Sequence, residues 1–362
     1  MRALTLALLL LLSASGAVAR VSADAPVNQA LVLSGRPAAT LAEYRFFRDA
    51  RAREPNAGVT PYDLNTALFS DDAVKFRYVY TPPGVSARYN ADGVFEFPVG
   101  TVLIKTFAYP ADARTPNGNI RFLETRLLIR QRDGWAAYPY VWNAEGDEAR
   151  YTPIGAEIPV ERVDEAGARV ALIWRAPNRN QCAGCHMSAG EIAPIGPAAR
   201  NLNRDYPYAE GGANQLTRWV ERGHLDAAPA DAPRAAEAFN PASGSLEARA
   251  RAYLDVNCAH CHNPAGPAHT SGLDLRSANA DATSLGVFKR PIAAGRASAD
   301  LAFSIEPGHT ERSILVHRMA SLDPGVMMPE LGRQSVDARG LALIREWIAG
   351  MNAPAPGAPL PH

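Results

Sequence analysis

Two patterns of apolar and polar residues divide the chain. Between about Tyr62 and Trp174, short runs rich in β-branched and aromatic residues are separated by turns that contain Pro, Gly, Asn and Asp. Runs and turns of this kind predict β-strands. The predicted strands cover 77–80, 93–97, 101–107, 125–129 and 137–142. This pattern favours a β-sandwich or a small barrel.

After Trp174 the chain becomes rich in alanine, and apolar residues recur at helical spacing. Helices are predicted over 214–222, 245–256, 312–319 and 336–351. Ser245 is a suitable N-cap for the second of them, and Leu343, Ile344 and Trp347 give the last one an apolar face. We therefore expect a multidomain protein, with a β-rich N-terminal domain followed by mainly α-helical units.

The length of 362 residues exceeds what one compact core usually holds, so several units are expected. A segment dense in Ala and Pro, without a periodic apolar pattern, predicts a linker between two helical units. The expected boundaries are 20–60 for an N-terminal extension, 61–175 for the β-rich domain, 176–226 for the first helical unit, 227–243 for the linker, 244–352 for the second helical unit and 353–362 for a flexible tail.

The first residues predict export. Met1-Arg2 gives a positive start, residues 4–12 form an apolar run, and Ala17-Val18-Ala19 is a small-x-small cleavage site, so residues 1–19 have the pattern of a signal peptide. No later stretch approaches the roughly 20 apolar residues that a spanning helix needs. We expect a periplasmic protein that does not span the membrane, and the formal net charge of zero argues against nucleic acid as its main partner.

All four cysteines fall into two CxxCH motifs, Cys182-Ala-Gly-Cys185-His186 and Cys258-Ala-His-Cys261-His262. At this spacing two thiols can add to the vinyl groups of a heme, and the adjoining histidine then binds the iron. The sequence thus predicts two covalently attached hemes c. Their expected thioether residues are Cys182, Cys185, Cys258 and Cys261, and their expected proximal iron ligands are His186 and His262.

Three other uses of CxxC pairs fit less well. A shared zinc site normally places its pairs about 15 to 20 residues apart and leaves the two histidines unexplained. A redox-active disulfide would not need histidine after both pairs. Structural disulfides within CxxC would close very short loops and constrain little.

The distal ligand of the second heme is expected from a Met-Pro turn. The segment Val326-Met327-Met328-Pro329 resembles the axial-methionine loop of class I cytochromes c, and this resemblance assigns Met328 to the iron, with Met327 as its rival. Most methionines only fill gaps in a core. A methionine ligand would give the second heme a comparatively high potential.

The distal ligand of the first heme is less evident. Met187 follows the proximal histidine and starts on the wrong face of the ring. The remaining candidates are His224, which follows the helix predicted at 214–222, the scarce lysines Lys75 and Lys105, a residue from the second unit, or no protein ligand. Of these we name His224 as the expected ligand.

Many segments resemble a family of bacterial exported diheme c-type cytochromes that join a β-rich N-terminal region to two cytochrome c units. The resemblance covers most of the chain after the signal peptide, and the segments that carry it are 68–71 with Ala73 and Lys75, 97–101, 105–107, 124–128, Tyr140 with 142–143, 182–186, 196–197, 202–203 and 214–216 with Trp219. It implies electron transfer outside the cytoplasm and leaves the distal ligand of the first heme open.

Three functions are compatible with these features. The first is electron transfer between periplasmic donor and acceptor proteins. The second is a peroxidase-like enzyme with an open iron at the first heme; segment 68–71 is similar to one in such enzymes, but there it lies shortly before the first motif. The third is a ligand-binding β-rich domain coupled to heme redox chemistry, with Trp135 and Tyr138 as candidate contacts, although aromatic residues on strands usually belong to the core.

Overall fold

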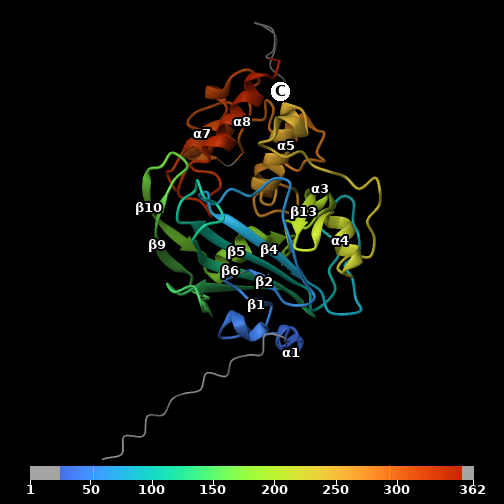
Figure 1. Cartoon of the computed structure of the whole chain (residues 1–362). Coiled ribbons are helices and arrows are strands. Elements are labelled where there is room, and N and C mark those ends of the chain that lie inside the picture. The colour runs from blue at the N-terminus through green and yellow to red at the C-terminus, as the bar shows by residue number, and fades with distance from the viewer. Residues whose placement is uncertain (1–24, 52, 293, 353–362) are drawn as a thin grey trace, which may run out of the picture.

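The computed structural model describes residues 25–51, 53–292 and 294–352 (Figure 1). The signal peptide expected at 1–19 and the tail expected at 353–362 lie outside these residues. No helix among the described residues is long and apolar enough to cross a membrane.

A six-stranded antiparallel sheet forms the centre of the molecule (Figure 1). Its strands follow one another in sequence order: β3 (Val59–Tyr62), β4 (Val74–Tyr80), β5 (Val102–Pro110), β6 (Ile120–Gln131), β7 (Gly134–Trp142) and β8 (Ala149–Tyr151). Each strand pairs with the next in the chain, as a meander does. The tight turn between β6 and β7 uses Gly134, whose φ of +136° strongly favours glycine.

The sheet is open at both edges. The prediction of a β-sandwich or a small barrel is therefore wrong. The outermost strands β3 and β8 do not pair with each other, and the second sheet of this half is only a hairpin of β9 (Ala156–Val163) and β10 (Arg169–Ala176). Four of the expected strands lie within β4, β5, β6 and β7. Residues 93–97 are not a strand, because Val94 and Glu96 make only single bridges, to Ala198 and Arg88.

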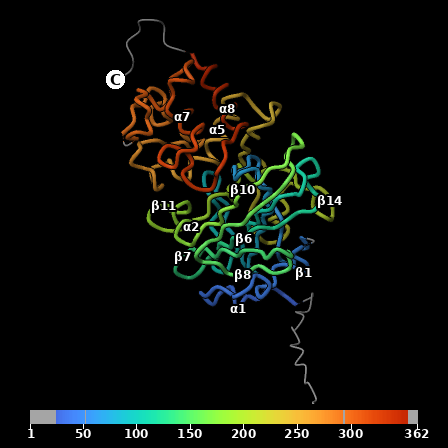
Figure 2. The backbone as a smooth tube through the Cα atoms, turned by 90° about the vertical axis from the view of Figure 1, so that its left-hand side faces the viewer, coloured from blue at the N-terminus to red at the C-terminus, as the bar shows by residue number. Residues whose placement is uncertain are grey.

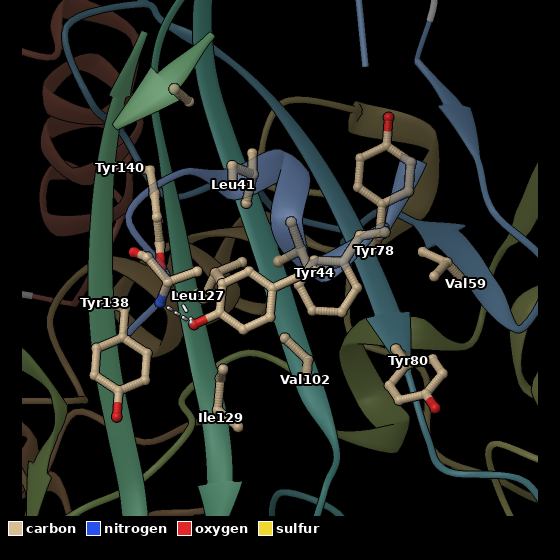
Figure 3. Close-up of a cluster of buried hydrophobic side chains, with 14 of the residues drawn as sticks. Leu41, Tyr44, Val59, Tyr78, Tyr80, Val102, Leu127, Ile129, Tyr138 and Tyr140 are labelled. Carbon is tan, nitrogen blue, oxygen red and sulfur yellow. Dashed lines mark hydrogen bonds between the residues drawn. The ribbon is translucent and has the colours of Figure 1, made fainter. Parts of the chain in front are cut away.

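The N-terminal residues cover one face of the sheet. They contain α1 (Gln29–Val32), the 3-10 turn η1 (Leu41–Tyr44), β1 (Phe47–Asp49) and β2 (Glu54–Pro55). Figure 3 shows Leu41 and Tyr44 against Leu127, Ile129 and Tyr140 of the sheet. The tyrosines are anchored by polar contacts, since the Tyr140 hydroxyl donates to the Ala38 carbonyl over 3.1 Å. Residues 25–60, expected to precede the β-rich domain, thus supply part of its core.

The opposite face of the sheet carries two separate apolar clusters. At one end Val79, Leu103 and Leu128 pack with Trp219 and Cys182 of the following segment. At the other end the β9–β10 hairpin packs against the sheet. The contact is an apolar cluster of sheet and hairpin residues: Phe107, Tyr109, Leu123, Ile158, Val160 and Trp174. A row of charged residues separates these clusters.

Short helices and turns make up the C-terminal half. They are α2 (Arg179–His186), β11 (Met187–Ser188), β12 (Glu191–Ile192), α3 (Ala199–Leu202), β13 (Asp205–Tyr208), β14 (Gly211–Asn214), α4 (Gln215–Glu221), η2 (Pro241–Ser243), α5 (Leu246–Asn257), η3 (His269–Ser271), α6 (Ala282–Leu285), η4 (Gly295–Ser298), η5 (Thr310–Arg312), α7 (Ile314–Ala320) and α8 (Ala338–Ala349). The four helices expected from the sequence correspond to α4, α5, α7 and α8, which confirms them to within one or two residues at most ends.

Helices α5 and α8 pack closely at the end of the molecule opposite α1 (Figure 1). The Tyr253 hydroxyl of α5 donates to Asp337 Oδ2 over 2.9 Å, while Asp337 Oδ1 accepts from the Gly340 amide and caps α8. A Cβ atom at residue 340 would collide with the ring of Tyr253. Glycine at this position therefore allows the close approach of the two helices.

The Ala/Pro-rich segment 227–243 contains no helix or strand apart from η2, yet it is hydrogen-bonded to the first helical unit and to the β-rich half. The Ala235 amide donates to the Arg200 carbonyl over 2.8 Å. Thr66 Oγ1 donates to the Ala236 carbonyl and accepts from the Ala238 amide, each over 3.0 Å. These bonds hold the connecting segment against the body of the protein.

Candidate functional site

Helix α2 presents the first CxxCH motif. Its N-terminus is fixed by a capping box, in which the side chains of Asn178 and Gln181 each accept from the other's backbone amide over 2.9 Å. Residues three and four positions apart share one side of a helix, so Cys182, Cys185 and His186 lie on the same side. Cys182 is buried in the apolar cluster on the sheet. The helix therefore directs all three donor side chains of the motif to one place.

His186 is held in one tautomer by the backbone. Its Nδ1 lies 2.9 Å from the carbonyl oxygen of Ala193, which can only accept, so Nδ1 carries the proton and Nε2 carries the lone pair. Burial lowers the pKa of His186 to about 4, and the charges of Lys105 and Arg126 act in the same direction. A neutral imidazole with Nδ1–H donated to a carbonyl is the usual state of a histidine that binds a metal through Nε2.

His262 of the second motif is held in the same way by a side chain. Its Nδ1 lies 3.0 Å from Ser271 Oγ, and that hydroxyl donates its own proton to the Ala268 carbonyl over 2.7 Å. Ser271 Oγ must therefore accept from His262 Nδ1, which leaves Nε2 of His262 with the lone pair. Burial lowers the pKa of His262 to about 4. Both motifs thus offer a neutral histidine with a free Nε2.

The two motifs lie next to each other although they are far apart in the sequence. The amide of Ala189, in the loop after the first motif, donates to the carbonyl of Ala265, in the loop after the second, over 2.9 Å. Figure 2 shows β11 of this loop directly below the C-terminal unit. Burial raises the pKa of the Cys261 thiol to about 11, and the neighbouring Cys185 contributes in the same direction. All four cysteines are free thiols.

The Met327-Met328 turn is anchored to α7 through Arg318. The Met328 amide donates to the Arg318 carbonyl over 3.0 Å, and Arg318 Nε donates to the Val326 carbonyl over 2.8 Å. Met327 is buried, with an exposed fraction of 8%, whereas Met328 is only partly buried. Both sulfur atoms belong to the unit that carries the second motif.

A loop of the β-rich half, which includes segment 68–71, is hydrogen-bonded to this second unit. In the sequence, only the family resemblance drew attention to this segment. The Phe69 amide donates to Oδ1 of Asn257, the residue before Cys258, over 2.7 Å. The buried Asp71 carboxylate accepts from the Gln334 and Ser335 amides and from Ser335 Oγ, the last over 2.6 Å. The loop is therefore bonded to the second unit at two places, Asn257 just before the second motif and residues 334–335 after the methionine turn.

His224 is not available as an iron ligand in this structure. It is buried, with an exposed fraction of 1%, and its two ring nitrogens lie 2.7 Å from Thr60 Oγ1 and 2.7 Å from Thr81 Oγ1. Both nitrogens are therefore engaged by hydroxyl groups of the sheet. This geometry argues against the distal role that its sequence position suggested, because position after a helix carries no information on which partners a side chain meets.

If hemes are bound at the motifs as the sequence predicts, we expect His224→Ala to leave their absorption spectrum unchanged. We also expect it to lower the free energy of unfolding by about 1–3 kcal/mol. The buried Thr81 hydroxyl loses its partner, and the Thr60 hydroxyl keeps only its bond from Arg222 Nη1. His309, whose side chain is 42% exposed and lies 3.3 Å from Glu311 Oε1, provides the control His309→Ala. Denaturant unfolding followed by circular dichroism measures the loss, and a changed spectrum of the first heme would restore His224 as a ligand.

The other residues predicted to bind iron or a ligand are two lysines and two aromatic residues of the sheet. Lys75 Nζ donates to the Ala73 carbonyl over 2.9 Å, whereas Lys105 Nζ lies 4.7 Å from the centroid of the Phe107 ring. Tyr138 is buried and donates to the Gly35 carbonyl, and Trp135 packs edge-on against Phe97. Tyr138 thus belongs to the packed core, and the partly buried Trp135 packs against a neighbouring apolar cluster.

The described residues contain no cluster of three or more His, Cys, Asp or Glu side chains placed to hold a metal ion. The donor set at each motif, with two thiols and a neutral histidine whose Nε2 is free, fits covalent attachment of a heme. Compared with family models, with curated proteins and with solved structures, the chain matches none.

Proposed function

We propose that this chain is a periplasmic c-type cytochrome with two hemes that carries electrons between redox partner proteins. The observation that carries the proposal is the state of both motif histidines, each neutral and each with Nδ1–H held by a protein acceptor. This arrangement orients a ligand and raises its basicity. A heme bound at each motif supplies the one-electron exchange of iron.

The chain's own residues have distinct roles in this proposal. Cys182 and Cys185 hold one porphyrin, and Cys258 and Cys261 hold the other. His186 and His262 bind the irons, with the Ala193 carbonyl and the Ser271 hydroxyl fixing their orientation. The apolar packing around Cys182 and around α5 keeps water from these side chains, and burial of this kind is one of the means by which a protein sets a heme potential.

We also infer that the C-terminal unit is cytochrome c-like. The helix that leads into the second motif, α5, packs against the terminal helix α8, and the methionine turn lies between α7 and α8 in the chain. The contacts among Tyr253, Asp337 and Gly340 fix the crossing of the two helices. This arrangement supports Met328 as a distal ligand of the second iron.

The function is tested by expressing the chain together with a heme-attachment apparatus. We expect a red protein whose pyridine hemochrome spectrum gives two hemes per chain, and whose intact mass exceeds that of the polypeptide by two hemes. A colourless protein with the mass of the bare polypeptide would refute the proposal.

Replacing Met328 by leucine is expected to abolish the sulfur-to-iron absorption band and to lower the midpoint potential of the second heme, because a thioether ligand favours the reduced iron. Leucine nearly conserves the volume of the side chain. The adjacent Met327→Leu is the matched control and should leave both the band and the potential unchanged. If the two variants exchange these results, Met327 is the ligand.

A second candidate function is peroxidase-like chemistry at an open iron of the first motif. It is favoured by one observation: His224, the expected distal ligand, and Lys75, another candidate, are already hydrogen-bonded to other groups. A purely low-spin ferric spectrum, with slow binding of cyanide or carbon monoxide, supports electron transfer. A high-spin first heme with peroxide turnover supports the enzyme.

A further inference from the structure

Three cationic side chains lie side by side across the centre of the sheet. Arg77 of β4 is directly opposite Lys105 of β5, and Lys105 is directly opposite Arg126 of β6. Residues directly opposite each other in antiparallel strands project from the same face, and like charges so placed repel each other. We call these three residues the cation row. It separates the two apolar clusters on the face that carries the first motif.

The cation row is only partly neutralised. Arg77, with an exposed fraction of 5%, pairs with Asp63 over 2.6 Å, and Arg126 forms a two-pronged pair with the buried Glu124. Lys105 has no carboxylate partner among the described residues. Arg77 Nη2 is buried without a hydrogen-bond partner in the same part of the chain. The row therefore combines one orphaned guanidinium N–H group with an unpaired Lys105 amino group, whose pKa burial and the charges of Arg77 and Arg126 hold well below its ordinary value.

Buried charges in proteins are normally paired, because removal of an unpaired ion from water costs a large free energy. The strand register holds Lys105 between two other cations, so repulsion adds to this cost. A bound anion would offset both the cost of removing the charge from water and the repulsion between the cations. The missing partner of the cation row is therefore a negatively charged group that residues 25–51, 53–292 and 294–352 do not supply.

The cation row also lies beside the first heme motif. Leu103 and Leu128 precede Lys105 and follow Arg126 by two residues, so they share the face of the sheet that carries the row. Both pack in one cluster with Cys182 of the first motif. The loop after that motif is joined to the loop after the second by the bond from the Ala189 amide to the Ala265 carbonyl, over 2.9 Å.

We propose that the cation row, with Lys105 at its centre, binds propionate carboxylates of the porphyrins attached at these motifs. The inference rests on the proposed function, since the porphyrins bring the anions. Guanidinium and ammonium groups form charge-assisted hydrogen bonds with carboxylates, which suits the orphaned Nη2 of Arg77 and the unpaired Nζ of Lys105. The β-rich half then contributes directly to binding the cofactor and to setting its potential.

The test compares Lys105→Gln with Lys105→Arg in the full-length holoprotein. Lysine occurs at only three positions, and Lys289→Gln serves as the matched control because Lys289 lies in the second unit, away from the sheet. Resonance Raman spectroscopy measures the propionate bending bands, and redox titration measures the midpoint potential of each heme. We expect Lys105→Gln to shift the bending bands and to lower one midpoint potential, because a positive charge beside the heme favours the reduced iron.

Lys105→Arg is expected to restore both readouts, and Lys289→Gln to change neither. Unchanged bending bands in Lys105→Gln overturn the inference. A low-spin heme that becomes high-spin in Lys105→Gln also overturns it, because Lys105 would then be an iron ligand. If Lys105→Gln fails to fold, Arg77→Lys gives the same test, since it keeps the charge beside Asp63 and removes the orphaned N–H group.

Pyridine hemochrome analysis of each preparation separates this inference from the function on which it rests. Two hemes per chain with unshifted Raman bands contradict only the role of the cation row. Absence of heme from the wild-type protein contradicts the proposed function itself.

Discussion

Replacing both cysteines of the first motif, in Cys182→Ser/Cys185→Ser, is expected to leave one covalently bound heme per chain instead of two. A hydroxyl cannot take the place of the thiol in the thioether bond to a heme vinyl group, and no other cysteine is available, since all four belong to the motifs. The same change at Cys258 and Cys261 should remove the other heme. Intact mass and the pyridine hemochrome spectrum measure the loss.

Ala183→Ser is the control for this experiment, because it alters a residue between the two cysteines without touching a donor side chain. It should retain both hemes. Retention of two hemes in either double-serine variant would contradict attachment at that motif. The variant that loses the first heme should also lose whatever spectral change Lys105→Gln produces in that heme.

Removal of the Glu124 carboxylate is expected to destabilise the protein by about 3–5 kcal/mol, as is usual when one partner of a buried ion pair is lost. Glu124 is fully buried, accepts two bonds from Arg126 and accepts from Trp174 Nε1 over 2.9 Å. Because the Arg126 side chain retains 30% exposure, we expect a value near the lower end for Glu124→Ala. Urea unfolding of the holoprotein measures it.

Glu157→Ala is the matched control, since Glu157 pairs with Arg175 on the hairpin while both side chains remain about two-thirds exposed. Such surface pairs contribute at most about 1 kcal/mol. Glu124→Gln should fall between these two, because it removes the charge but can still accept from Trp174. Equal losses in Glu124→Ala and Glu157→Ala would show that the Glu124 pair contributes no more than a surface pair.

Much of the local structure could be predicted from the sequence, because strands and helices leave short-range patterns. The four helices after Trp174 and the four central strands were predicted at nearly the correct positions. The strand expected at 93–97 was wrong for a physical reason: Phe95 and Phe97 alternate as strand residues do, but they pack on Trp219 and Trp135 from a segment that makes only single bridges. The closure of a sheet depends on its edge strands, which leave no such pattern.

Heme attachment at the two motifs stays a prediction, which the sequence alone can make because the chemistry requires a fixed spacing along the chain. The surroundings of the motifs could not be predicted, because they depend on contacts between distant residues. Thr60 and Thr81 engage His224, and Asp71 meets Ser335, without any signal in the local sequence. The scarcity of lysine drew attention to Lys105, but its position between two arginines follows only from the strand register.

The contacts of Phe69 and Asp71 with the second unit bear on the distance between the two hemes proposed for this chain. They tie the second unit to the sheet on which the first motif rests, and the bond between Ala189 and Ala265 joins the two motif loops directly. Electron tunnelling slows exponentially as donor and acceptor separate. With both hemes attached as proposed, this cross-linking would hold the tunnelling gap constant, so that exchange between the irons does not wait for thermal motion of the connecting segment.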